Sequence, residues 1–72
     1  MSFWQLYFDG AARKNSAGAG VVLITPSGGL IPYSLSILAT CTNNVAEYEA
    51  LIIGLEIALE MQISYLRVFG NP

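Results

Sequence analysis

Residues 3–9 alternate between two faces, as the side chains of a β-strand do. Leu6 and Phe8 share one face, and Asp9 falls on the other, directly before Gly10. Because a glycine at that point lets the chain turn, we expect the strand to end at Asp9. The pattern therefore predicts a charged side chain at the end of an apolar strand.

The rest of the chain predicts two more strands, one helix and a final strand. The expected bounds are 18–25 and 30–38 for the two strands, 45–62 for the helix and 65–69 for the last strand. A helix followed by a strand implies a crossover that lays the last strand parallel to the first. We therefore expect one α/β domain over residues 1–72, with three antiparallel strands, one helix and one parallel strand.

The predicted helix carries its acidic residues on opposite sides. Glu49, Glu56 and Glu60 share one side, which is an ordinary water-facing stripe. Glu47 stands opposite to them, between two apolar arcs. Since burial of an unpaired charge is unfavourable, Glu47 is predicted to have a partner.

Two interpretations of Glu47 remain open from the residues alone. In the first, Asn44 is the N-cap of the helix and Glu47, three residues later, bonds back to the cap. In the second, Glu47 is a metal ligand or an acid–base group that faces Asp9. The two are compatible, because a cap that fixes a side chain also positions a ligand.

The composition favours part of a larger domain. Of the 72 residues 54% are hydrophobic and only 11% are charged, which leaves little polar surface to cover a core. We expect one apolar arc of the helix to form an exposed patch that associates with a complementing carboxy-terminal half or with another copy. The patch contains Ala50, Ile53, Ile57 and Met61.

Charge and cysteine content bear on partners and compartment. The net charge of −2 and the pI near 4.6 argue against a free-standing nucleic-acid binder. The lone Cys41 excludes an internal disulfide and is typical of a reducing compartment. The sequence has no signal-peptide pattern and no membrane span, so we expect an intracellular protein, with nucleus and cytoplasm both open.

Three motifs, in this order and spacing, resemble the amino-terminal half of a type 1 ribonuclease H domain, particularly the kind in plant retroelement polyproteins. They are Tyr-Phe-Asp-Gly-Ala at 7–11, Ala-Gly-Ala-Gly-Val-Val at 17–22 and Thr-Asn-Asn-Val-Ala-Glu-Tyr-Glu-Ala-Leu at 42–51. The resemblance implies an endonuclease that cleaves RNA in RNA–DNA hybrids with two Mg²⁺ ions. It covers nearly the whole chain but about half of a family domain.

The resemblance also implies roles for single residues. Asp9 would bridge the two Mg²⁺ ions and Glu47 would hold one of them. Asn71 occupies the place of a family aspartate, and its amide is a weak ligand because it carries no charge. The later histidine and the last carboxylate of the family have no counterpart, so we expect these 72 residues to be inactive as a nuclease by themselves.

The same resemblance places a second group of residues along the minor groove of the hybrid, where 2′-hydroxyls distinguish RNA from DNA. They are Gly10, Asn15, Thr42, Asn43 and Asn44. From the residues alone, Asn15 is equally well a turn residue, and the last three equally well cap the helix. The rival to the whole interpretation is a non-catalytic small α/β regulatory or interaction domain.

Overall fold

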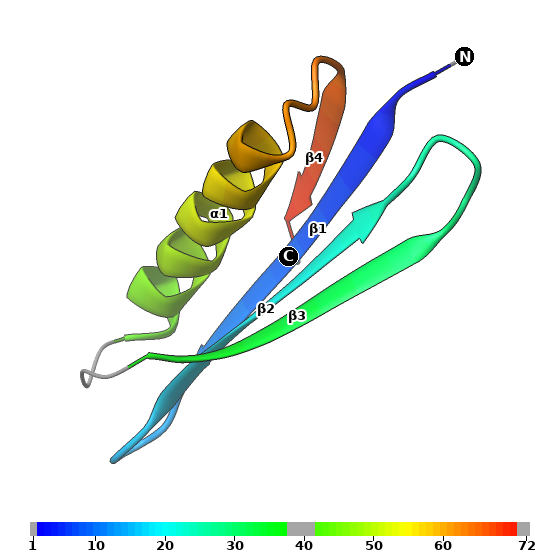
Figure 1. Ribbon diagram of the computed structural model, residues 1–72. Helices are drawn as coiled ribbons and strands as arrows, with labels where there is room; N and C mark the ends of the chain where they lie inside the picture. The colour runs from blue at the N-terminus through cyan, green and yellow to red at the C-terminus, as the bar shows by residue number, and fades with distance from the viewer. Residues whose placement is uncertain (1, 38–41, 71–72) are drawn as a thin grey trace.

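The computed structural model describes residues 2–37 and 42–70, which form a four-stranded sheet with one helix against one of its faces (Figure 1). The elements are β1 (Trp4–Ala12), β2 (Ala17–Ile24), β3 (Leu30–Ile37), α1 (Asn43–Glu60) and β4 (Leu66–Gly70). The strand order is β3-β2-β1-β4. β1, β2 and β3 are antiparallel in turn, and β4 is parallel to β1. The predicted fold class is confirmed.

The first strand is longer than predicted, and its glycine is not a turn. β1 continues to Ala12, with Gly10 paired to Ala19 of β2, so Asp9 lies within the strand. The connection to β2 is the loop 13–16. The prediction of a strand that ends at Asp9 was wrong because Gly10 is needed for packing against α1 and not for a change of direction.

The core lies between the sheet and α1. Leu6, Val21 and Leu23 are fully buried, and Leu6 and Phe8 lie on the same face of β1, as predicted. Half-buried side chains from β3, α1 and β4 pack around these three; among them are Tyr33, Ile57 and Leu66. One helix therefore covers the apolar face of two central strands, β1 and β2.

Small residues let α1 lie close to the sheet. Its buried positions are Ala46, Ala50, Gly54 and Ala58. A Cβ atom at Gly54 would be only 2.8 Å from Cδ1 of Leu6, a separation that real Cβ contacts essentially never show. Gly54, inside the helix, therefore permits α1 to pack closely against the sheet.

The exposed apolar side of α1 is not the one predicted. Ala50 is fully buried, Ile57 packs against the core and Ile53 is half-buried, so of the predicted patch only Met61 is exposed. The small side chains draw that arc toward the sheet. The exposed apolar residues of the opposite arc, here named the outer stripe, are Tyr48, Ile52, Leu55 and Leu59.

The helix ends two residues before its predicted limit. Gln62 has a φ of 57°, and its N–H donates to the carbonyl of Leu59, while the N–H of Ile63 donates to the carbonyl of Ala58. This pair of bonds is the Schellman motif, which satisfies the last carbonyls of a helix and stops it. In the part of the chain that the structure describes, no helix is long and apolar enough to cross a membrane.

Candidate functional site

Gly10 brings β1 and α1 into backbone contact. It is buried, and a Cβ atom on it would lie 2.2 Å from the carbonyl carbon and oxygen of Ala46 and 2.4 Å from the nitrogen of Glu47. No residue larger than glycine fits at that separation. The contact therefore sets the peptide before Glu47 directly beside the residue that follows Asp9, although the two carboxylates are far apart in the sequence.

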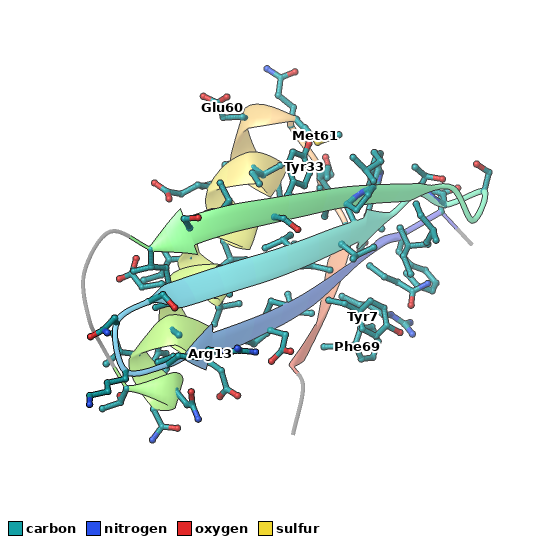
Figure 2. The ribbon with its side chains drawn as sticks, turned by 90° about the horizontal axis from the view of Figure 1, so that it is seen from below. Tyr7, Arg13, Tyr33, Glu60, Met61 and Phe69 are labelled. Atoms are coloured by element: carbon teal, nitrogen blue, oxygen red, sulfur yellow. The ribbon has the colours of Figure 1, made fainter. Side chains whose placement is uncertain are left out.

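A hydrogen bond between Ala12, two residues after Gly10, and Asn43, three residues before Ala46, also holds β1 and α1 together. The backbone N–H of Ala12 donates to Oδ1 of Asn43 at 2.7 Å. The bond fixes the first turn of α1 to the last residue of β1. The loop 13–16 begins directly after Ala12, so exposed Asn15 lies at the same end of β1 as the start of α1 (Figure 2, at the labelled Arg13).

Thr42, and not Asn44, is the N-cap of α1. Its backbone is extended, with φ −80° and ψ 165°, and its Oγ1 accepts a hydrogen bond from the N–H of Val45 at 3.2 Å. Asn44 therefore lies inside the first turn, which contains no acidic residue. Glu47 is five residues from the cap, so the capping interpretation of this glutamate was wrong.

Glu47 is more shielded than the other glutamates of α1. It is half-buried, whereas Glu49, Glu56 and Glu60 are exposed. It lines a hollow of about 290 Å³ whose other walls are Phe8, Asn44, Tyr48 and Leu51. With the cap assigned to Thr42, the structure gives Glu47 no helix-capping role, and the residue lines a hollow together with two aromatic residues, a leucine and an asparagine.

Asp9 is exposed and opens onto the other side of β1. It lines the hollows on the sheet face that α1 leaves bare, beside Tyr7, Phe69 and Gly20. Tyr7 and Phe69 stack there with ring centroids 5.0 Å apart (Figure 2). The structure thus brings the backbones at Asp9 and Glu47 together, while the hollows that the two side chains line are different.

The donors available for a metal ion are carboxylate oxygens. Within residues 2–37 and 42–70, no group of three or more His, Cys, Asp or Glu side chains is close enough to hold a metal. Asn71, the predicted third ligand, lies outside the described residues. Asp9 and Glu47 nevertheless suit Mg²⁺, which prefers oxygen and is commonly held by one or two carboxylates together with substrate phosphates.

Sequence reasoning missed three contributions to this site. It gave Asn43 no structural partner, and it did not place Phe8 and Tyr48 beside Glu47. Tyr48 directly follows Glu47, and Phe8 directly precedes Asp9, so their neighbourhood in the motifs was a usable signal. The bond between Asn43 and Ala12 had none, because it joins positions 31 residues apart.

Comparison with known proteins identifies the group to which this arrangement belongs. Residues 7–71 match the family described as Reverse transcriptase-like. Ribonuclease HI of Halobacterium salinarum is 39% identical over 67 residues, which are 90% of this chain and 34% of that protein. The chain therefore spans about a third of the length of this curated relative.

Solved structures of similar proteins share the fold. The RNase H1 of Halobacterium salinarum NRC-1 superposes with a TM-score of 0.86 at 38% identity, over 96% of this chain and 54% of its own. LC11-RNase H1, solved in complex with an RNA/DNA hybrid, superposes with a TM-score of 0.81 at 40% identity, over 96% of this chain and 54% of its own. The N-terminal RNase H domain of a Mycobacterium tuberculosis protein gives 0.84 at 30% identity, over 100% of this chain and 54% of the other.

The motifs, the sheet order and these relatives agree with one another. The match to the family extends over nearly all of the chain, and the superpositions include both the strand that carries Asp9 and the helix that carries Glu47. The chain belongs to the Reverse transcriptase-like family and forms part of a ribonuclease H-type domain.

Proposed function

We propose that this chain binds RNA–DNA hybrids and supplies Asp9 and Glu47 to a Mg²⁺-dependent site that cleaves the RNA strand. The observation that carries the proposal is the backbone contact of Gly10 with the peptide between Ala46 and Glu47, which sets the two carboxylates on adjoining segments. The relative LC11-RNase H1, at 40% identity, was solved with an RNA/DNA hybrid. That complex supports the hybrid as the class of substrate.

Asp9 and Glu47 are the residues that would hold the metal. Bound Mg²⁺ supplies an activated water and neutralises charge on the leaving oxygen of a phosphodiester. A metal also offsets an electrostatic obstacle, because the chain has a net charge of −2 and would otherwise repel nucleic acid. The exposed Asp9 is accessible to substrate phosphates, and the half-buried Glu47 has fewer alternative positions.

The start of α1 and the loop before β2 are the proposed contacts to the hybrid. Asn15, Thr42, Asn43 and Asn44 are exposed at the same end of the molecule. Oδ1 of Asn43 already accepts from Ala12, so its Nδ2 is the group left to donate to a ribose 2′-hydroxyl. Gly10 is buried, and what it contributes is the close approach of β1 to α1.

We expect these 72 residues to bind hybrid more effectively than they cleave it. Two carboxylates and the uncharged amide of Asn71 attract Mg²⁺ less strongly than three carboxylates do. Asn71→Asp is expected to raise the apparent Mg²⁺ affinity without producing full activity. A titration of Mg²⁺ against cleavage of a labelled hybrid measures both quantities.

Binding gives the sharper test because it does not depend on turnover. Fluorescence anisotropy is expected to show Mg²⁺-dependent binding that favours an RNA–DNA hybrid over duplex DNA of the same sequence. Asp9→Asn and Glu47→Gln should remove the Mg²⁺ dependence, whereas Glu56→Gln, an exposed glutamate of the same helix, is the matched control and should retain it. Equal affinity for both duplexes, or equal behaviour of all three variants, contradicts the proposal and favours a non-catalytic interaction domain.

A further inference from the structure

The face of the sheet opposite α1, here named the bare face, carries a pair of exposed aromatic rings. Tyr7 and Phe69 are partners in the pairing of β1 with β4, and their rings stack with centroids 5.0 Å apart and planes 16° apart (Figure 2). They are 42% and 39% exposed. A hollow of about 510 Å³ lies against the rings, and the rest of the bare face around it is formed by Asp9, Gly20, Val22, Pro32 and Ser34. The rings are therefore open to a planar ligand.

Two glycines of β2 keep the bare face flat. Gly18 and Gly20 lie inside the strand, in a pairing register that continues on both sides without a bulge. A Cβ atom on Gly18 would lie 3.5 Å from the carbonyl oxygen of Leu35, and one on Gly20 would lie 4.0 Å from that of Asp9. Both are ordinary contacts, so the packing of the chain does not require glycine at either position. Since glycine weakens a strand, glycines of this kind are typical of a place where a ligand approaches closely.

Charge is divided between the two sides of the molecule. Four of the five acidic residues are glutamates of α1, and the fifth, Asp9, is on the bare face. Arg67 pairs with Gln5 on the same face, and its Cζ is 4.2 Å from the ring centroid of Phe3. Arg13 lines a second hollow that includes Asp9. The bare face thus carries two of the three cationic residues of the chain, although the net charge of the whole is −2.

We propose that the bare face binds unpaired RNA, with a base stacked against the rings of Tyr7 and Phe69. Exposed aromatic rings on an open sheet face hold unpaired bases, and cationic side chains beside them hold the phosphates. Arg67 and Arg13 lie toward opposite ends of β1 and complement the charge of such a strand. The aromatic pair, the two glycines and the two arginines together favour nucleic acid over an apolar peptide, which would gain nothing from the arginines.

Asp9 connects this face with the proposed hybrid site. It is two residues from Tyr7 on the same face, which is about 7 Å along the strand. An RNA strand with a phosphate at Asp9 therefore brings a neighbouring nucleotide to the rings. The assignment of the occupant to the RNA strand, where that strand leaves the hybrid, rests on the proposed function.

The first experiment measures fluorescence anisotropy of a labelled single-stranded RNA with EDTA present, so that no metal site takes part. We expect saturable binding that weakens as the salt concentration rises, because phosphate contacts release counterions. Phe69→Ala is expected to weaken binding at least about fivefold, through loss of stacking. Val68→Ala is the matched control, since Val68 is 43% exposed on the same strand but pairs with Leu6 on the face that carries α1. It should leave binding unchanged.

Gly20→Val tests the surface without removing a ring. Its Cβ fits and valine favours strands, so the urea midpoint of unfolding should not fall, while the side chain occupies the flat part of the bare face. We expect binding of the single-stranded RNA to weaken at least about fivefold. Absence of binding, or equal binding by the wild type and the Phe69→Ala and Gly20→Val variants, overturns the proposal. Self-association of the chain that Phe69→Ala abolishes also overturns it, because the bare face is then an interface between copies.

A second experiment, with Mg²⁺, compares a blunt RNA–DNA hybrid with hybrids that carry an overhang on the RNA strand or on the DNA strand. An RNA overhang at one end is expected to tighten binding at least about fivefold, and a DNA overhang to leave it unchanged. Equal gains from both overhangs overturn the assignment to RNA. Binding of the blunt hybrid without binding of single-stranded RNA overturns this inference alone. Binding of single-stranded RNA without binding of any hybrid overturns the proposed function and leaves the bare face as an RNA site.

Discussion

The two sides of α1 differ in a way that runs against a simple interpretation of hydrophobicity. The side toward the sheet is made of small residues, Ala46, Ala50, Gly54 and Ala58, and all four are buried. The outer stripe is made of large apolar residues and is exposed. The side with less apolar surface per residue is therefore the one in contact with the core.

This difference shows that the side of α1 that can approach β1 most closely is the one that is buried, although its side chains are smaller than those of the outer stripe. Glycine at two positions removes the atoms that would keep β1 and α1 apart, at Gly10 in the strand and at Gly54 in the helix. The large apolar residues are left on the outer stripe, where they are exposed. The predictions below test the contrast, beginning with the position where the packing is tightest.

Gly10→Ala is expected to have the largest effect on stability. Its Cβ would meet backbone atoms of Ala46 at 2.2 Å, and backbone cannot rotate away as a side chain can. We expect a loss of about 3 kcal/mol or more in the free energy of unfolding, measured with urea. Gly18→Ala is the control, because its Cβ would lie 3.5 Å from the carbonyl oxygen of Leu35, an ordinary contact. Equal losses would show that loss of a strand glycine, and not the approach of α1, explains the effect.

Gly54→Ala is expected to lower stability less than Gly10→Ala does. Here the atoms in the way belong to the side chain of Leu6, which can shift, and alanine favours the helix by about 1 kcal/mol. The expected net loss is about 1 kcal/mol, since overpacking costs about 1–3 kcal/mol. In a Leu6→Val background the loss should shrink, and a double-mutant cycle measures this coupling. Additive effects would mean that Gly54 does not set the distance between helix and sheet.

The N-cap of α1 is expected to contribute about as much to the free energy of unfolding as Gly54 does. Thr42→Ala removes the hydrogen bond from the N–H of Val45 to Oγ1 and is expected to lower stability by about 1 kcal/mol. Asn44→Ala, inside the first turn, should change stability by less than about 0.5 kcal/mol. Thermal unfolding followed by circular dichroism compares the two. The reverse order would restore Asn44 as the cap.

The smallest effect on stability is expected from substitutions in the outer stripe. Leu59→Ala removes a side chain that is 76% exposed, so the free energy of unfolding should change by less than about 0.5 kcal/mol. Leu6→Ala, the same deletion in the core, should cost about 2–5 kcal/mol. A large loss of stability on Leu59→Ala would mean that the outer stripe is buried in solution, for example by self-association.

Most of the fold was accessible from the sequence. Alternation of side chains identified the first strand, turn residues separated the next two strands, and the order of helix and strand implied the parallel pairing of β4 with β1. The exposed apolar side of α1 was wrong because a helical wheel gives angles without the position of the sheet. Alanine and glycine carry little weight in such a pattern, yet here they mark the buried side.

The candidate site was predicted less completely. Asp9 was singled out as a charge at the predicted end of an apolar strand, and Glu47 as a charge between two apolar arcs of the helix. The structure sets the backbones at these two residues side by side. The turn at Gly10 and the cap at Asn44 were wrong because each residue type serves more than one purpose. Glycine permits both turns and close approach of two backbones. Asparagine can cap a helix, but it can also accept a hydrogen bond from a neighbouring strand, as Asn43 does from Ala12.

The contact at Gly10 has a consequence for how this sequence can vary. Because the obstructing atoms are backbone atoms of Ala46 and Glu47, no exchange of side chain at either position can compensate a change at Gly10. Gly54 is different, since a smaller residue in place of Leu6 makes room for it. Correlated substitutions among related sequences should therefore link positions 6 and 54. They should be silent about the closer contact at position 10, where glycine is expected without exchange.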